Sequence, residues 1–192
     1  MENRKTFMLA ESGVLLALGL ALSYFKIGAF WAYGGSITPA SMLPIVFLAY
    51  KYGVRWGIGC GFVHGVLQLL LQGLGDLPSF AKTPGSFFAV IVLDFLVAFA
   101  VVGLAGIFKD IIKNPAMSII AGSILGVSAR FVCHFIIGAI VWGEYAPEDW
   151  SAVLYSFVYN IGYMGPEIVI TSVAAGLLIG LSYVQNRLET EN

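Results

Sequence analysis

The chain has 192 residues, of which 59% are hydrophobic and 11% are charged, and its mean hydropathy is +0.88. This composition lies outside the range of soluble globular domains and indicates an integral membrane protein. The formal net charge of −1 gives no basic excess, which argues against nucleic acid as a partner. Cys60 and Cys133 fall in different apolar segments, so they predict neither a disulfide framework nor a metal site.

Apolar segments separated by polar, glycine- or proline-containing turns follow one another along the chain. A helix needs about 20 apolar residues to cross a bilayer. In chain order, the expected spans cover residues 7–25, a short segment at 42–52, then 56–72, 87–108, 116–142 and 151–183. Because lipid offers backbone polar groups no partner, each span should be a helix. We therefore predict one all-α domain over residues 1–192, an integral membrane bundle of six transmembrane helices.

Lys and Arg residues are divided unevenly between the two sides of these spans. Cytoplasmic loops are enriched in such residues. Lys26 and Lys82 lie on one side, and seven lie on the other: Arg4, Lys5, Lys51, Arg55, Lys109, Lys113 and Arg187. We therefore predict that both termini are cytoplasmic. The glycine-rich stretch after the first span and the loop before the last span should then face outside.

Ionisable side chains at membrane depth are functional candidates because charge is costly there. They are His64, Asp94, Arg130, His134 and Glu167. Arg130 and His134 are four residues apart, hence on one face of the fifth span. On the sixth span, Asn160, Tyr163 and Glu167 also share a face. These spacings predict two polar stripes that meet inside the bundle.

Several of these residues also have a purely structural interpretation. We interpret Arg130 and Glu167 as an ion pair that joins the last two spans, and His64 as a hydrogen-bonded packing residue. Aromatic residues form another such group: they suit an interfacial belt or helix packing as well as a ligand site, and they are Trp31, Trp142, Trp150, Tyr155, Tyr159 and Tyr163. His134 and Asp94 have no partner at helical spacing within their own segments, which favours a functional site.

The side chains available for such a site indicate the kind of ligand. Trp and Tyr rings offer faces for stacking and for cation–π attraction. Asp94 is an anionic acceptor, whereas Asn160 and His134 supply neutral hydrogen bonds. Arg130 alone is too little positive charge for a phosphate or a dicarboxylate. The inventory therefore predicts a flat, nitrogen-rich, cationic heterocycle.

Two stretches, "ARFVCHFIIGAIVWGEYAP" and "VLYSFVYN", closely resemble the fifth and sixth helices of the thiamin-specific substrate-binding subunits of energy-coupling factor transporters. "LDFLVAFAVVGLAGIF" resembles the fourth helix of that family, and "GGSITPASMLPI" resembles its first external loop and second helix. The likeness covers nearly the whole chain. It implies a role in high-affinity thiamin uptake at a bacterial cell membrane.

The resemblance also implies roles for single residues. Trp142 would stack on the aminopyrimidine ring of thiamin, and Asp94 would hydrogen-bond the nitrogens of that ring. His134 and Tyr155 would flank the thiazolium, with Asn160 as a further polar contact.

The resemblance leaves the roles of two further positions open. Trp31 would close the pocket from the first external loop, with Tyr33 as a competitor for that place. Phe95 stands where the family has Tyr, so it would keep the packing face and lack the hydroxyl.

Energy for transport must come from partners, because the chain has no nucleotide-binding loop. The resemblance implies a membrane coupling protein and two cytoplasmic ATPase subunits, with the first helix docking through an A-x-x-x-A pattern. Ala17 and Ala21 fit this pattern, preceded by Gly13 at the same spacing. Small residues four apart let helices approach closely, so packing inside the bundle is the alternative from spacing alone.

Two other classes of function can be weighed against this one. A stand-alone proton-coupled carrier could use Asp94, Glu167 and His134 as a relay. A membrane enzyme could use His134 and Asp94 as acid and base, but no nucleophile or metal motif supports it. We therefore predict a transport protein that is not an enzyme and that needs no cofactor or metal.

Overall fold

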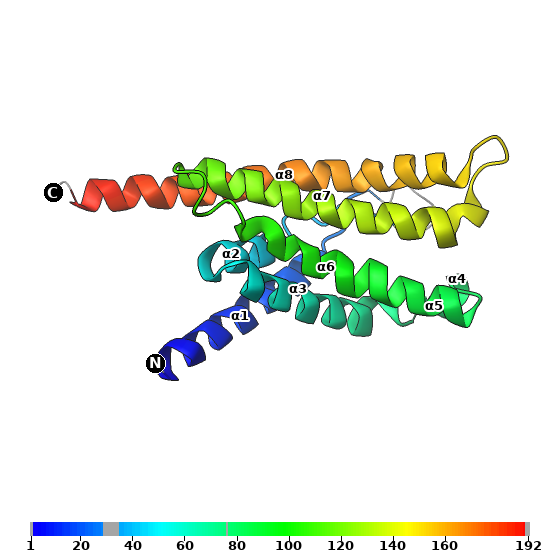
Figure 1. Ribbon diagram of the computed structural model, residues 1–192, viewed down its shortest axis with the longest axis horizontal. Coiled ribbons are helices and arrows are strands. Elements are labelled where there is room, and N and C mark those ends of the chain that lie inside the picture. The colour runs from blue at the N-terminus through cyan, green and yellow to red at the C-terminus, as the bar shows by residue number, and fades with distance from the viewer. Residues whose placement is uncertain (1, 29–34, 76, 191–192) are drawn as a thin grey trace.

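The computed structural model describes residues 2–28, 35–75 and 77–190. Helices make up nearly all of this part of the chain (Figure 1), as the all-α prediction requires. In chain order they are α1 (Glu2–Ser23), α2 (Leu43–Tyr52), α3 (Val54–Gln68), η1 (Leu69–Gly73), α4 (Leu77–Phe80), α5 (Pro84–Val90), η2 (Ile91–Val97), α6 (Ala98–Ala100), η3 (Val101–Gly106), α7 (Pro115–Val141), η4 (Trp142–Tyr145) and α8 (Ala152–Thr190). η1 and η2 are π-helical continuations of their neighbours, whereas η3 and η4 are 3₁₀.

Five helical runs are long and apolar enough to cross a membrane in the part of the chain that the structure describes. They are Asn3–Ser23, Val54–Gly73, Pro84–Gly106, Pro115–Tyr145 and Ala152–Leu181. The predicted second span corresponds to α2, which has 10 residues and rises about 15 Å at 1.5 Å per residue. The bundle therefore holds six apolar helices, of which α2 covers about half of a 30 Å hydrocarbon layer.

Helix ends differ from the predicted spans where polar residues continue or cap a helix. The fourth span starts at Pro84 rather than near residue 87, because Thr83 and Ser86 form a reciprocal capping box that satisfies free backbone donors. α7 starts at Pro115, directly after Asn114, whose side chain accepts a hydrogen bond from the Met117 backbone at 3.0 Å.

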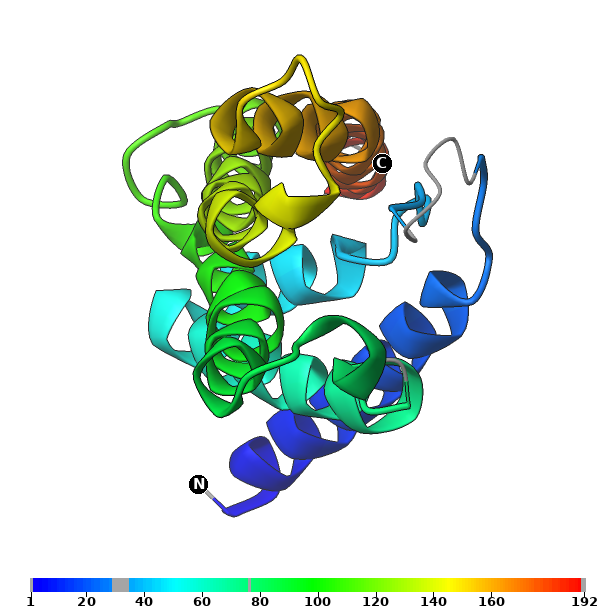
Figure 2. The same cartoon turned by 90° about the vertical axis from the view of Figure 1, so that its right-hand side faces the viewer.

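The core surrounds α2. Figure 2 shows α2 among the other helices, with α7 and α8 on one side and α1 on the other. The α2 side chains of Ile45, Val46 and Leu48 are fully buried. The chain leaves α2 at Gly53, whose φ of 93° suits glycine, and enters α3 at once. This tight turn places α3 beside α2.

Glycines allow the helices around α2 to approach closely. A Cβ atom at Gly103 would lie 2.2 Å from the Ile58 backbone nitrogen, and one at Gly122 would lie 1.9 Å from the Ala105 carbonyl oxygen. α7 and α8 pack side by side as an antiparallel pair, and both chain ends lie at one end of the molecule (Figure 1). Backbone contact through small residues is how helices associate where lipid gives no hydrophobic drive.

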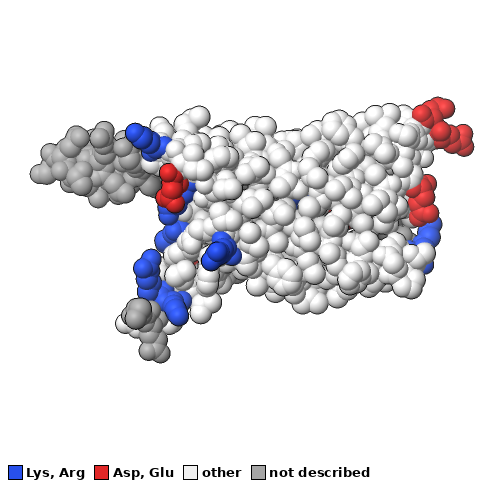
Figure 3. Space-filling model, viewed as in Figure 1, with Lys and Arg blue, Asp and Glu red and all other residues white. Residues whose placement is uncertain are grey.

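Charged side chains on the surface seen in Figure 3 gather at the two ends of the bundle. Figure 3 shows a broad uncharged band between them, with Lys and Arg gathered at the end that holds the termini. This division agrees with the uneven Lys and Arg distribution in the sequence. A cytoplasmic location of the termini remains a prediction.

Candidate functional site

A cavity of about 370 Å³ lies in the half of the bundle away from the termini. It is bounded by the segment at residues 35–41, by η1 and η2, and by facing stretches of α7 and α8. Its position follows from the length of α2. Because α2 fills only one half of the bundle, the other half is left without a central helix.

Most of the predicted substrate-binding residues line this cavity. They are Asp94, Phe95, His134, Trp142, Tyr155 and Asn160. Trp31 and its competitor Tyr33 lie outside the described residues. The structure thus brings six of the seven candidates to one place, and their roles toward a ligand remain predictions.

Asp94 and Phe95 come from the π-helical segment η2. A π-turn widens the helix locally and is frequent at functional sites. The Phe95 ring packs on the other π-helical segment, η1: a Cβ at Gly73 would lie 2.5 Å from Phe95 Cζ. The two π-helical segments therefore pack against each other where they line the cavity.

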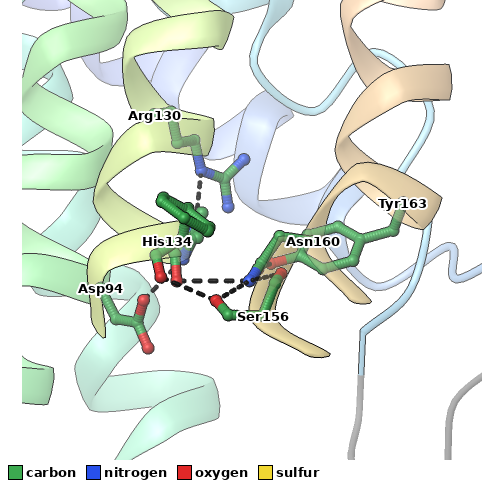
Figure 4. A network of polar contacts seen from close by, with 7 residues as sticks. Asp94, Arg130, His134, Ser156, Asn160 and Tyr163 are labelled. Carbon is green, nitrogen blue, oxygen red and sulfur yellow. Dashed lines mark hydrogen bonds and ion pairs between the residues drawn. The ribbon is translucent and has the colours of Figure 1, made fainter. Parts of the chain in front are cut away.

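Asp94, His134 and Arg130 form a connected row (Figure 4). His134 Nδ1 lies 2.6 Å from Asp94 Oδ1, and Arg130 Nε donates to His134 Nε2 at 3.1 Å. A guanidinium has donors only, so Nε2 must be the acceptor and Nδ1 must carry the hydrogen that faces Asp94. Asp94 and His134 are therefore partners across two helices. His134 also has a partner in its own helix, Arg130, so the prediction that it has none there is wrong.

This arrangement corrects the expected role of His134. Both ring nitrogens are engaged within the protein, so the residue offers a ligand its ring face instead of a free hydrogen bond. Tyr163 packs against the ring edge-on, with centroids 6.2 Å apart. Asp94 keeps one carboxylate oxygen without a hydrogen bond to any described residue, and its side chain is 16% exposed.

The predicted ion pair between Arg130 and Glu167 is wrong. Arg130 stacks on the Phe99 ring at 4.2 Å from its centroid, and Nη1 lies 2.7 Å from Met42 Sδ. Glu167 instead accepts hydrogen bonds from the Thr38 backbone and hydroxyl. Each of the two charged groups therefore has its partners on other elements.

His64 behaves as the packing residue that was predicted. It is fully buried, its ring packs on Phe99 at 5.0 Å, and Nε2 lies 3.4 Å from Gln68 Nε2. Nδ1 has no partner among the described residues. Gln68 lines the cavity, whereas His64 lies behind it.

Asn160 joins α8 to α7. Its amide nitrogen donates to the Ser156 carbonyl at 2.8 Å and approaches the His134 carbonyl at 3.3 Å, while Tyr163 donates to its Oδ1 at 2.7 Å. α8 can come this near because α7 has Gly138 there: a Cβ would lie 2.3 Å from Ser156 Oγ. These contacts fix the orientation of the Asn160 amide.

The tyrosine stripe on α8 lines the cavity: Tyr159 and Tyr163, for which helix packing and a ligand site were both open from the sequence, lie there together with the predicted Tyr155. Their rings follow one another with centroids 5.7 and 5.9 Å apart. The signal that could have found them is their spacing of four residues, which adds the stripe to the face that carries Asn160.

A polar contact near the end of α7 was not predicted from the sequence. Lys82 Nζ lies 2.9 Å from Glu144 Oε1 and 5.6 Å from the Tyr145 ring centroid. Trp142 packs next to Tyr145, with ring centroids 6.2 Å apart. The hydrogen bond to Glu144 raises the pKa of Lys82 above its ordinary value. Both partners are largely exposed, so the pair is worth little stability.

A polar, aromatic-lined cavity between membrane-spanning helices is typical of membrane proteins that bind a small molecule. The chain belongs to the thiamine transporter family: the model described as Thiamine transporter protein (Thia_YuaJ) matches residues 9–186. Its relatives are transporters and not enzymes.

Two curated relatives and one solved structure illustrate this likeness. The thiamine transporter ThiT of Bacillus subtilis is 28% identical over 188 residues, which are 92% of each chain. ThiT of Lacticaseibacillus paracasei is 28% identical over 93% of this chain and 89% of its own. A solved structure of ThiT from Listeria monocytogenes matches with a TM-score of 0.74 and 22% identity, over 93% of this chain and 96% of that chain. The last likeness shows the fold.

Proposed function

We propose that this multi-pass membrane protein captures thiamin from outside the cell as the substrate-binding subunit of an energy-coupling factor transporter. Membership of the thiamine transporter family supports the substrate. The coupling protein and the two ATPase subunits follow from the resemblance of the sequence to such subunits. The cavity offers a place for the vitamin between α7, α8 and η2.

The observation that carries this proposal is the carboxylate of Asp94 in an aromatic-lined cavity. One oxygen of Asp94 contacts the neutral ring of His134, and the other has no hydrogen bond to any described residue. Arg130 donates to His134 and not to Asp94. A partly buried carboxylate is costly unless its charge is compensated. A ligand with a single positive charge, such as the thiazolium of thiamin, would compensate it.

Aromatic faces suit the same ligand. Trp142 and the three tyrosines of α8 surround the cavity, and cations are attracted to such faces by about 0.5–2 kcal/mol each. The free oxygen of Asp94 is an acceptor for an amino group or a protonated ring nitrogen. We infer that the flat rings lie between Trp142 and the α8 tyrosines, with Asp94 at one edge.

Titration of the purified protein with thiamin tests the proposal. Tryptophan fluorescence should be quenched saturably by thiamin, with an affinity near the nanomolar range, about −12 kcal/mol. Riboflavin and biotin at the same concentrations should leave it unchanged. No response to thiamin, or an equal response to all three vitamins, would refute thiamin as the substrate.

The exposed face of α1 supports docking on a coupling protein. Gly13, Ala17 and Ala21 are all exposed, and a Cβ at Gly13 would meet nothing within 4 Å. Ser12, Leu16 and Ser23, on another face of α1, are buried against the bundle. The stripe of small residues is therefore left uncovered by the described part of this chain, and we infer that a partner helix covers it.

A stand-alone proton-coupled carrier is the second candidate. The direct contact between Asp94 and His134 favours it, because these groups could exchange a proton. Such a carrier would take up thiamin without the ATPase subunits, and uptake would collapse with the proton gradient. Uptake that needs the ATPases and survives loss of the gradient would exclude it.

A further inference from the structure

The segment at residues 35–41 forms one wall of the cavity, although it is neither helix nor sheet for most of its length. Gly35, Ser36, Thr38 and Ser41 line the cavity. At its start, Ile27 and Ile37 exchange two backbone hydrogen bonds of 2.8 and 3.2 Å. A segment without regular structure needs further partners to keep one position in a membrane.

Two residues of α8 supply those partners. Tyr159 OH accepts a hydrogen bond from the Gly35 backbone at 2.7 Å. Two turns further along α8, Glu167 Oε1 accepts from the Thr38 backbone and, at 3.0 Å, from the Thr38 hydroxyl. Hydrogen bonds to a carboxylate are stronger than those to a neutral group. Thr38 is therefore the more firmly held of the two points.

Glu167 makes no other hydrogen bond among the described residues. It is 1% exposed, and Oε2 has no hydrogen-bond partner among the described residues. It does not line the cavity, whereas Thr38 does. A carboxylate buried at this depth is costly, and its hydrogen bonds go to the cavity wall alone.

The wall also contains a strained residue. Ala40 has a φ of 61°, a left-handed conformation that residues with a Cβ rarely adopt. Such residues persist only where their surroundings hold them. Ser41 donates its backbone hydrogen bond to the Thr38 carbonyl at 3.0 Å, and the two hydroxyls lie 2.8 Å apart. Thr38 thus links the strained turn to Glu167.

We propose that Glu167 is a positioning residue that anchors the 35–41 wall through Thr38 and thereby controls how slowly a bound ligand leaves the cavity. Thiamin as the ligand rests on the function proposed above, whereas the anchoring itself does not. If the wall is loosened, a bound ligand can leave more easily, whereas a ligand that enters the cavity loses few of its first contacts. Loss of the anchor should therefore raise the dissociation rate much more than it changes the association rate.

The experiment compares Glu167→Leu, Glu167→Gln and a matched control, Thr171→Val. Thr171 is buried one turn further along α8, and its hydroxyl has no hydrogen bond within the described part. Hydrogen exchange of a peptide that covers residues 35–41 is measured without ligand, and thiamin association and dissociation are measured by stopped-flow fluorescence. Glu167→Leu should speed exchange and raise the dissociation rate at least ten-fold, with association within three-fold of wild type.

Glu167→Gln should stay within about three-fold of wild type, because the amide oxygen still accepts both Thr38 donors. Unchanged exchange and dissociation in Glu167→Leu would overturn the proposal, and so would equal losses in the Gln and Leu variants. If Glu167→Leu does not fold, Thr38→Val tests the proposal instead, since it removes one hydrogen-bond donor and keeps the charge of Glu167. The dissociation rate should then rise several-fold. An unchanged dissociation rate would refute the anchor. A wild type that ignores thiamin would refute the substrate, while hydrogen exchange would still test the anchor.

Discussion

Trp142 is the largest aromatic side chain among the described residues that line the cavity. Trp142→Ala should weaken thiamin binding ten-fold or more, about 1.4 kcal/mol or above, because stacking area and cation–π attraction are both lost. Calorimetry suits the measurement, since the substitution also changes the fluorescence. Trp150→Ala is the matched control: Trp150 is 38% exposed and does not line the cavity. Equal thiamin affinities of wild type and Trp142→Ala would show that the indole does not contact the ligand.

Asp94 supplies the negative charge nearest to His134. Asp94→Asn keeps an oxygen that can accept from His134 Nδ1 and removes the charge, so it tests electrostatics with little change in shape. We expect a loss of ten-fold or more in thiamin affinity, because hydrogen bonds to charged groups are about twice as strong as neutral ones. Glu148→Gln, in the exposed loop before α8, should change nothing. A wild-type affinity in Asp94→Asn would contradict a charged contact.

The bonding pattern of His134 predicts a single tautomer. Because Arg130 can only donate, His134 should be neutral with the hydrogen on Nδ1. ¹⁵N NMR of the ring nitrogens at neutral pH should show one protonated and one unprotonated nitrogen. The chain has two histidines, so a His64→Gln variant assigns the signals. A doubly protonated His134 ring would show that Arg130 does not donate to it.

The sequence alone could identify the types of side chain in the site but not their pairing. Spacing on a helix shows that Arg130 and His134 share a face, and they do bond each other. It cannot show which residues of other helices lie opposite, because that depends on crossing angles and close approaches such as the one at Gly138. The Arg130–Glu167 pair was predicted wrongly for this reason. Thr38, the true partner of Glu167, lies in a segment without periodicity.

Among the elements, long apolar segments were predictable and irregular ones were not. α7 and α8 coincide with the expected spans within a residue at their starts, because apolar composition and capping residues are local signals. The π-helical turns η1 and η2 carry no sequence signature that separates them from α-helix. The role of α2 in leaving space for the cavity also became clear only from its packing.

A substitution on the small-residue face of α1 tests whether this helix docks on a partner. Ala17→Trp places a large ring on an exposed face that the bundle does not use, so thiamin binding by the purified chain should stay within two-fold of wild type. Uptake by cells that also express the coupling protein and ATPases should fall below a tenth, because close helix approach is blocked. Leu18→Trp is the control, since Leu18 is 49% exposed one residue outside the stripe. Normal uptake in Ala17→Trp would refute docking through this face, and loss of binding would indicate misfolding.

At the scale of the whole molecule, the cavity and the basic residues lie at opposite ends. Six described Lys and Arg residues flank the end with the termini: Arg4, Lys5, Lys51, Arg55, Lys109 and Lys113. The cavity lies toward the other end, where Trp142 and Tyr145 line it. Cytoplasmic span ends are enriched in Lys and Arg. The charge pattern and the position of the cavity therefore favour the same orientation, with the cavity toward the outside.

Cysteine labelling in intact cells tests that orientation. Cys60 and Cys133 are both buried, and their replacement by Ala gives a background without thiols. Glu148→Cys, in the exposed loop before α8, should react with a membrane-impermeant maleimide in whole cells. Lys113→Cys, exposed at the opposite end, should react only after lysis, because positive charge holds that end on the cytoplasmic side. The reverse pattern would place the cavity toward the cytoplasm, where a scavenging role could not operate.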